Sequence, residues 1–198
     1  MSSLYSDPPF RRGSTALALS ATDVVTTDSV GVVEGRSIVG TVKVFQDTNP
    51  TTGATLSDRL VFCVAARYKG SSALDATTNA GLVYLFDTAA PLEQFGNAGG
   101  PVATSSNLTS AIQSYGVLDE YLTGSVQPND IVWLVVKGPC AVKQTAAAIT
   151  KAAFVGPSTA GSVATAASAA VAIGQQIAGA DTTAAVQSVR INLANPCI

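Results

Sequence analysis

The stretch Asp130–Cys140, DIVWLVVKGPC, places six apolar residues in a row from Ile131 to Val136. A strand with one face in water alternates apolar and polar residues, and this run does not alternate. Both faces of the expected strand are therefore buried, either inside one domain or partly against another protein chain. Lys137-Gly138-Pro139 follows and predicts that the strand ends and the chain turns out.

Other segments also have the character of strands. Ser37–Phe45 (SIVGTVKVF) alternates, with Val42 and Val44 on its apolar face, and predicts a half-buried strand. Asp47–Ser57 is rich in Asn, Pro, Gly and Thr and predicts a loop. The remaining segments expected to form strands are Arg59–Tyr68, Leu82–Phe86, Phe154–Val155, Ser162–Thr165, Ala170–Ile177 and Ala185–Leu193.

Many short strands separated by Gly and Pro turns predict an all-β fold, a compact β-barrel or β-sandwich with at most one or two short helices. One helix is expected at Ser106–Tyr115. Ala170–Ile177 fits a helix as well as a strand, and its central glycine favours the strand. Residues 1–22 lack periodicity and contain Pro8-Pro9, so they predict an extended N-terminal arm before a β-rich domain at 23–198.

The composition points to a protein that works in an assembly. The 198 residues are 47% hydrophobic but only 12% charged, whereas soluble proteins usually carry about 25% charged residues. A surface made of Ala, Thr, Ser, Gly and Asn is poorly protected against association with other chains. The formal net charge of −2 provides no cationic field, so no nucleic-acid partner is expected.

The sequence gives no sign of export or membrane insertion. Its beginning, MSSLYSDPPFRRG, lacks the charged and apolar regions of a signal peptide. No apolar run approaches the roughly 20 residues that span a bilayer. We therefore expect a protein made and folded in the cytoplasm, without a membrane partner.

The reactive residue types are few. The chain has no histidine, which removes Ser-His-Asp and Cys-His catalysis and histidine metal ligation. Cys63, Cys140 and Cys197 are odd in number and irregularly spaced, which argues against a disulfide framework and a zinc site, although their pairing stays open. Lys137 and Lys143 are the only basic residues near Cys140 that favour a reactive thiolate.

The acidic residues give no clear catalytic pair either. Asp119-Glu120 and Asp130 form the only candidate carboxylate group, and adjacent strand residues point to opposite faces. We interpret them as solvated turn charges rather than a glycosidase-like pair. Trp133 is expected to pack in the core rather than to stack on a sugar. The sequence thus predicts a protein that is not an enzyme and has no catalytic residue, cofactor or metal.

The predicted arm carries the candidate partner-binding residues. Tyr5 and Phe10 are apolar side chains without a strand or helix pattern around them, and Arg11-Arg12 follows directly. One interpretation is that Tyr5 and Phe10 anchor the arm on a neighbouring acidic surface, where Arg11 and Arg12 pair with carboxylates. The alternative is that the two arginines are simply solvated charges.

Gly116–Leu193 resembles a known family. The run GVLDEYLTGSVQPNDIVWLVVKGPCAV is similar to a block of tailed-bacteriophage capsid decoration (cement) proteins, in which an Asn-Asp turn precedes a strand closed by Lys-Gly-Pro. The order STAGSV, AVAIGQQIAGA and VQSVRINL downstream is also similar to that group, and VGVVEGRSIVG adds a weaker likeness. The motifs are moderately specific, because glycine-punctuated strands are common.

The resemblance implies a structural role in the virion. Such proteins are small, rich in β-structure and often trimeric, and they reinforce the capsid exterior where major capsid subunits meet. It implies a homotrimer with the major capsid protein as partner, and one face of Ile131–Val136 buried against a neighbouring protomer. A pilin-like or adhesive surface protein and a trimeric β-rich enzyme of dUTPase type are the alternatives.

Overall fold

The structure is a computed structural model that describes residues 39–49, 52–87, 93–96, 115–122, 124–145, 149–158, 160–166, 172–176 and 186–192. Strands dominate these residues and most pair antiparallel, so the prediction of an all-β fold is confirmed. Within them the α-helix is the single turn α1 (Ala76–Asn79). The predicted arm at 1–22 and the helix at Ser106–Tyr115 lie outside the described residues, except Tyr115, which begins a strand.

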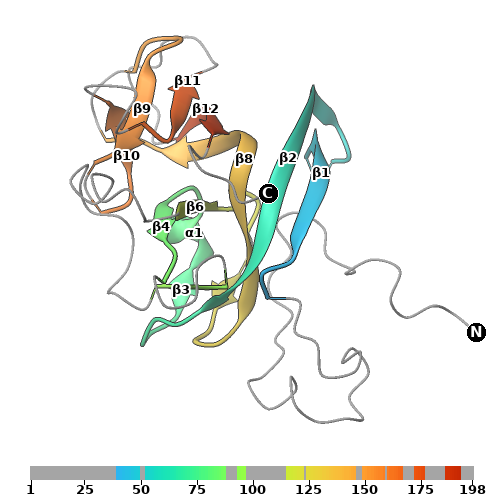
Figure 1. Ribbon diagram of the computed structural model, residues 1–198, viewed down its shortest axis with the longest axis vertical. Coiled ribbons are helices and arrows are strands. Elements are labelled where there is room, and N and C mark those ends of the chain that lie inside the picture. Colours follow the sequence, from blue (N-terminus) through green and yellow to red (C-terminus); the bar gives the residue numbers. More distant parts are fainter. Residues whose placement is uncertain are drawn as a thin grey trace, which may run out of the picture.

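One large sheet organises the fold (Figure 1). Its main path runs β1-β2-β8-β12-β11-β9-β10. In chain order these strands are β1 (Val42–Thr48), β2 (Thr55–Tyr68), β8 (Ile131–Lys143), β9 (Phe154–Pro157), β10 (Val163–Thr165), β11 (Gly174–Gln176) and β12 (Val186–Asn192). Beside this path, β4 (Val83–Leu85) pairs with β6 (Tyr115–Leu118), β6 also pairs with β8, and β5 (Gln94–Phe95) pairs with β2. A separate two-stranded sheet joins β3 (Leu74–Asp75) to β7 (Ser125–Val126).

The apolar run Ile131–Val136 forms the first half of β8 and is the centre of the core. None of its six side chains is more than 4% exposed. On one face, the edge of the Phe45 ring meets Trp133, with centroids 5.6 Å apart. On the other face, Leu134 lies against Gly116 of β6. The chain itself therefore buries both faces, as expected for a central strand, and the run gives no support for a neighbouring protomer.

β8 does not end at Lys137-Gly138-Pro139, and that prediction is wrong. It continues to Lys143 and exchanges partners, because residues up to Lys137 pair with β2 and residues from Lys137 onward pair with β12. The exchange depends on Gly138, whose φ is +109°. A Cβ at this position would collide with the backbone oxygen of Leu60, so β8 crosses the β2 backbone too closely for any side chain.

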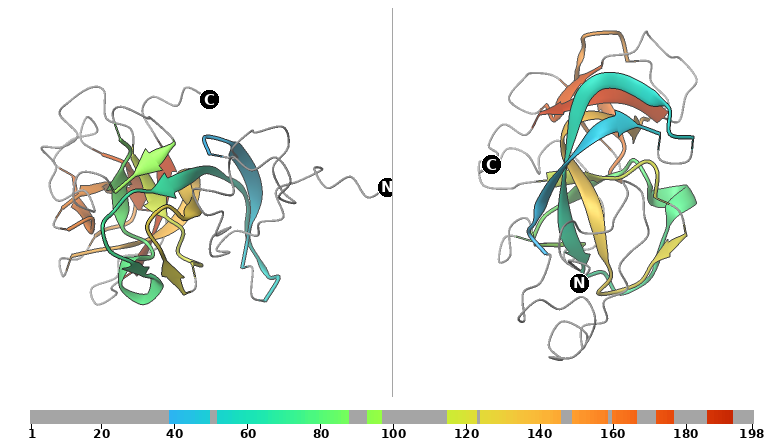
Figure 2. Two further views of the ribbon diagram at one scale, coloured as in Figure 1. Left: turned by 90° about the horizontal axis from the view of Figure 1, so that it is seen from below. Right: turned by 90° about the vertical axis from the view of Figure 1, so that its right-hand side faces the viewer.

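The exchange divides the sheet into two parts. Beyond the pair Phe62–Lys137, the described part of the chain places only β1 beside β2, so the two strands continue as a two-stranded ribbon. Figure 1 shows this ribbon diverging from the β9–β12 region, and Figure 2 shows β1 running beside the strongly bent β2. We call Val42–Thr48 together with Thr55–Phe62 the β1–β2 ribbon.

The other part of the sheet curls back on β8. β12, β11, β9 and β10 follow one another, and Gln144 then makes a parallel bridge to Val163 of β10. Thr145 donates its backbone N–H to the Val163 oxygen at 2.9 Å, directly after β8 ends. These bonds satisfy backbone groups on the far side of β10, in contrast to the ribbon at the opposite end of the sheet.

An aromatic cluster fills the core where β2, β4 and β5 meet. The Phe95 ring lies 5.3 Å from the Tyr68 ring and 5.3 Å from the Tyr84 ring, centroid to centroid. Both tyrosines keep a hydrogen bond: Tyr84 donates to Asn79 Oδ1 at 3.0 Å and Tyr68 donates to the Ser72 oxygen at 2.8 Å. Burial raises the pKa of both phenols above the usual value.

Replacing Gly138 by Ala tests the close crossing. The methyl group must displace the β2 backbone and adopt a positive φ, so we expect Gly138→Ala to cost roughly 3 kcal/mol or more of unfolding free energy. Gly53→Ala is the matched control, because its φ is +73° and no atom lies within 4 Å of the added Cβ. It is expected to cost about 1 kcal/mol. Equal costs in chemical denaturation would contradict the crossing.

Replacing Trp133 by Ala tests the centre of the core. Trp133 is 4% exposed, so Trp133→Ala should lower the unfolding free energy by about 3–5 kcal/mol. Phe154→Ala is the control at an aromatic residue that is 40% exposed, and it should cost much less. Native tryptophan emission should also be blue-shifted. Emission like that of indole in water would show that Trp133 is not buried.

Buried Tyr115 predicts a loss of stability at high pH. Burial raises its pKa from 10.0 to about 12. Between these values the unfolded chain has released the phenol proton and the folded chain still holds it, so rising pH favours unfolding. Unfolding free energies measured from neutral pH to pH 12 should fall less for Tyr115→Phe than for the wild type, by roughly 2 kcal/mol at the alkaline end. Parallel curves would contradict this assignment.

Candidate interaction surface

The predicted partner-binding residues Tyr5, Phe10, Arg11 and Arg12 lie outside the described residues. The hypothesis that the arm docks on a partner therefore stays a prediction. Among the described residues, the groups that could form a site are acidic side chains, thiols and exposed apolar side chains.

The acidic residues singled out in the sequence stabilise turns. Asp119 follows β6, and its Oδ1 accepts the backbone N–H of Tyr121 at 3.0 Å. Asp130 precedes β8, and its Oδ2 accepts the backbone N–H of Gln127 at 2.7 Å. Asp119 is only 1% exposed, so the prediction that it is a solvated charge is wrong. Both carboxylates have local structural roles, and the structure gives no indication that they act on one substrate.

Glu120 lies beside Cys140 rather than beside a second carboxylate. The Cys140 thiol is buried and donates to Glu120 Oε2 at 3.0 Å. A negative carboxylate opposes formation of the thiolate that a nucleophilic cysteine needs. Lys143, which the sequence placed near Cys140, instead donates through Nζ to the Thr77 oxygen at 2.8 Å. Burial lowers the pKa of Lys143, and the Asp75 carboxylate opposes that shift.

The described residues contain no group of three or more His, Cys, Asp or Glu side chains that could hold a metal ion. Among the same residues, no helix is long and apolar enough to cross a membrane. Trp133 is buried, so its ring is not available to stack on a ligand. The unusual feature of the described residues therefore lies on their surface and not in a cleft with reactive groups.

That feature is a set of apolar side chains exposed on the β1–β2 ribbon. Val44 is 45% exposed, Leu60 is 53% exposed and Leu56 is 54% exposed. Val44 pairs with Phe62, and Leu60 pairs with Gln46, so Val44, Leu60 and Phe62 share one face. Leu56 lies farther along β2, beyond the register shift. We call the exposed residues Val44, Leu56 and Leu60 the ribbon patch.

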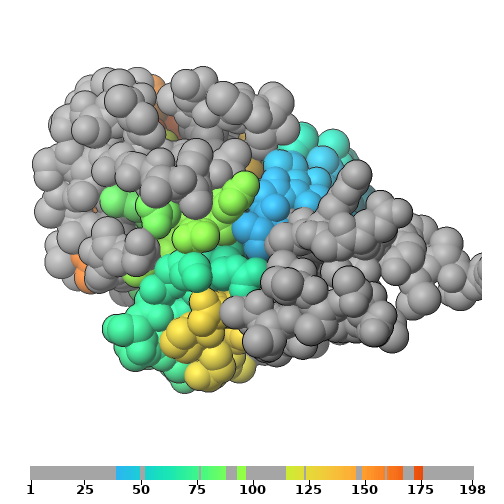
Figure 3. Space-filling view, turned by 60° about the horizontal axis from the view of Figure 1, so that its bottom comes forward, coloured from blue at the N-terminus to red at the C-terminus, as the bar shows by residue number. Residues whose placement is uncertain are grey.

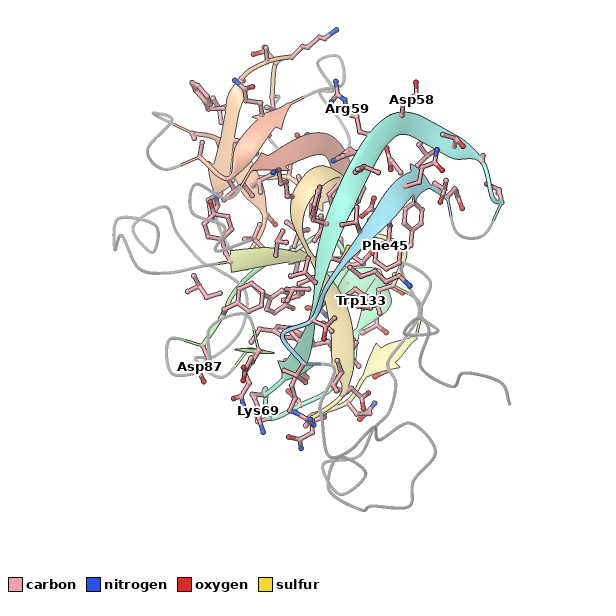
Figure 4. The ribbon with its side chains drawn as sticks, turned by 45° about the vertical axis from the view of Figure 1, so that its right-hand side comes forward. Phe45, Asp58, Arg59, Lys69, Asp87 and Trp133 are labelled. Atoms are coloured by element: carbon pink, nitrogen blue, oxygen red, sulfur yellow. The ribbon has the colours of Figure 1, made fainter. Side chains whose placement is uncertain are left out.

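The opposite face of β1 is the one that packs on the core. Phe45 contacts Trp133 from this face, and Figure 4 shows the two rings close together beside the ribbon. The alternation in the sequence placed Val44 on the buried side, and this prediction is wrong. Phe45 has the larger aromatic surface, and its contact with Trp133 determines which side of β1 faces inward.

Charged residues lie at the base of the ribbon patch and within it. Lys137 Nζ lies 5.2 Å from the centroid of the Phe62 ring, at the base of the ribbon where β8 departs. Asp58 and Arg59, labelled in Figure 4, are exposed between Leu56 and Leu60. Protein–protein contact surfaces commonly combine apolar and polar groups.

A two-stranded ribbon is marginally stable in water unless something covers it. In this structure Val42, Phe45, Val61 and Phe62 of the ribbon pack on the core, and Leu56 and Leu60 remain exposed nearer its far end. Figure 3 shows atoms of β1 and β2 at the molecular surface. The sequence carries no signal of this surface, because the apolar run that begins at Leu60 predicts a buried Leu60.

Comparison with known proteins adds no relative to this description. Searches with this chain matched no protein-family model, no curated protein and no solved structure.

Proposed function

We propose that this chain is a non-enzymatic structural protein that attaches to another protein surface through the ribbon patch. The observation that carries the proposal is the exposure of Val44, Leu56 and Leu60 on a ribbon that β8 leaves uncovered. Fully burying a Val or Leu side chain contributes about 1.5–3 kcal/mol, so three such residues are a substantial source of binding energy. Single exposed apolar residues are ordinary, but a group on one projecting ribbon is not.

The proposed surface is the exterior of a tailed-bacteriophage capsid, with the major capsid protein as partner. This part rests on the resemblance of Gly116–Leu193 to capsid decoration proteins and on the low charge of the whole chain. The homotrimer expected from the resemblance remains part of this proposal.

The local chemistry is consistent with a structural role. Asp119 and Asp130 hold turns, and Glu120 accepts a hydrogen bond from a buried thiol. No observation favours a pilin-like protein or an enzyme of dUTPase type. A dUTPase-type enzyme would need acidic and polar groups that converge at a subunit seam. Asp119, Glu120 and Asp130 instead each bond to a different local group of the chain.

The first test is quantitative mass spectrometry of particles purified from the virus that encodes the chain. The proposal expects the chain in a fixed ratio to the major capsid protein, and expects protease added outside the particles to remove it. Capsids that contain their other structural proteins in full but lack this chain would contradict the proposal.

The second test locates the attachment surface. The double variant Leu56→Ser/Leu60→Ser should attach to undecorated capsids roughly 15- to 200-fold more weakly than the wild type, because two half-exposed anchor side chains lose the burial that attachment would give them. Its stability should change little, since both residues are exposed. Phe154→Ser is the matched control, with an exposed apolar residue on β9 outside the ribbon.

Measuring occupancy on the capsid also distinguishes attachment through the ribbon from attachment through the predicted arm. Deleting residues 2–12 removes Tyr5, Phe10, Arg11 and Arg12 without touching the ribbon. Weaker attachment of the deletion variant alone would move the contact to the arm and contradict the role of the ribbon. Weaker attachment of Phe154→Ser alone would move it to β9.

A further inference from the structure

We draw no further inference here: the strongest candidate, the edge of β1 (Val42–Thr48) at the end of the main sheet path, where the described residues place no second strand, carries no proposal because nothing in the structure shows what covers it.

Discussion

The close crossing of β8 over β2 at Gly138 is the constraint on which the rest of the structure depends. Up to Lys137, β8 pairs with β2 and forms the buried centre of the core. Past Gly138 it pairs with β12 and carries the sheet toward β9 and β10. Because one strand serves both parts, β2 pairs with β8 only as far as Phe62, and beyond it the described residues place only β1 beside β2. The exposed ribbon is thus a direct consequence of the crossing.

The most apolar segment of the chain is also not the one that is exposed. The six residues Ile131–Val136 are the most apolar run, yet the chain buries them completely and they contribute nothing to the surface. Among the described residues, the exposed large apolar side chains are instead Val44, Leu56 and Leu60 of the ribbon and Phe154 of β9. Three exposed apolar side chains change the composition of a sequence very little.

Periodicity predicted the strands well, but it could not assign their faces or partners. The sequence predicted β-structure at Arg59–Tyr68 and at Ile131–Lys137, and both segments are strands. Alternation in β1 gives two faces without saying which one meets the core, and the contact of Phe45 with Trp133 decides that question. The continuation of β8 was missed because Gly138-Pro139 usually marks a turn, and only the approach of the β2 backbone shows why glycine stands there.

Candidate site residues were harder to predict, because their exposure depends on contacts between strands that are far apart in the sequence. Asp119 was expected in solvent, but it is buried and holds a turn through the N–H of Tyr121. The exposure of Leu60 depends on where β8 leaves β2, a tertiary feature that a single sequence does not encode locally. The arm residues carry a pattern that suggests a role, but they lie outside the described residues and remain a prediction.

Hydrogen–deuterium exchange of the chain, free and attached to capsids, tests the central claim that the β1–β2 ribbon is the contact surface. Amides at 42–48 and 55–62 should exchange more slowly when the chain is attached, while amides of β3, β7, β9 and β10 should be unchanged. Slower exchange confined to β9 and β10, with the ribbon unchanged, would contradict the account.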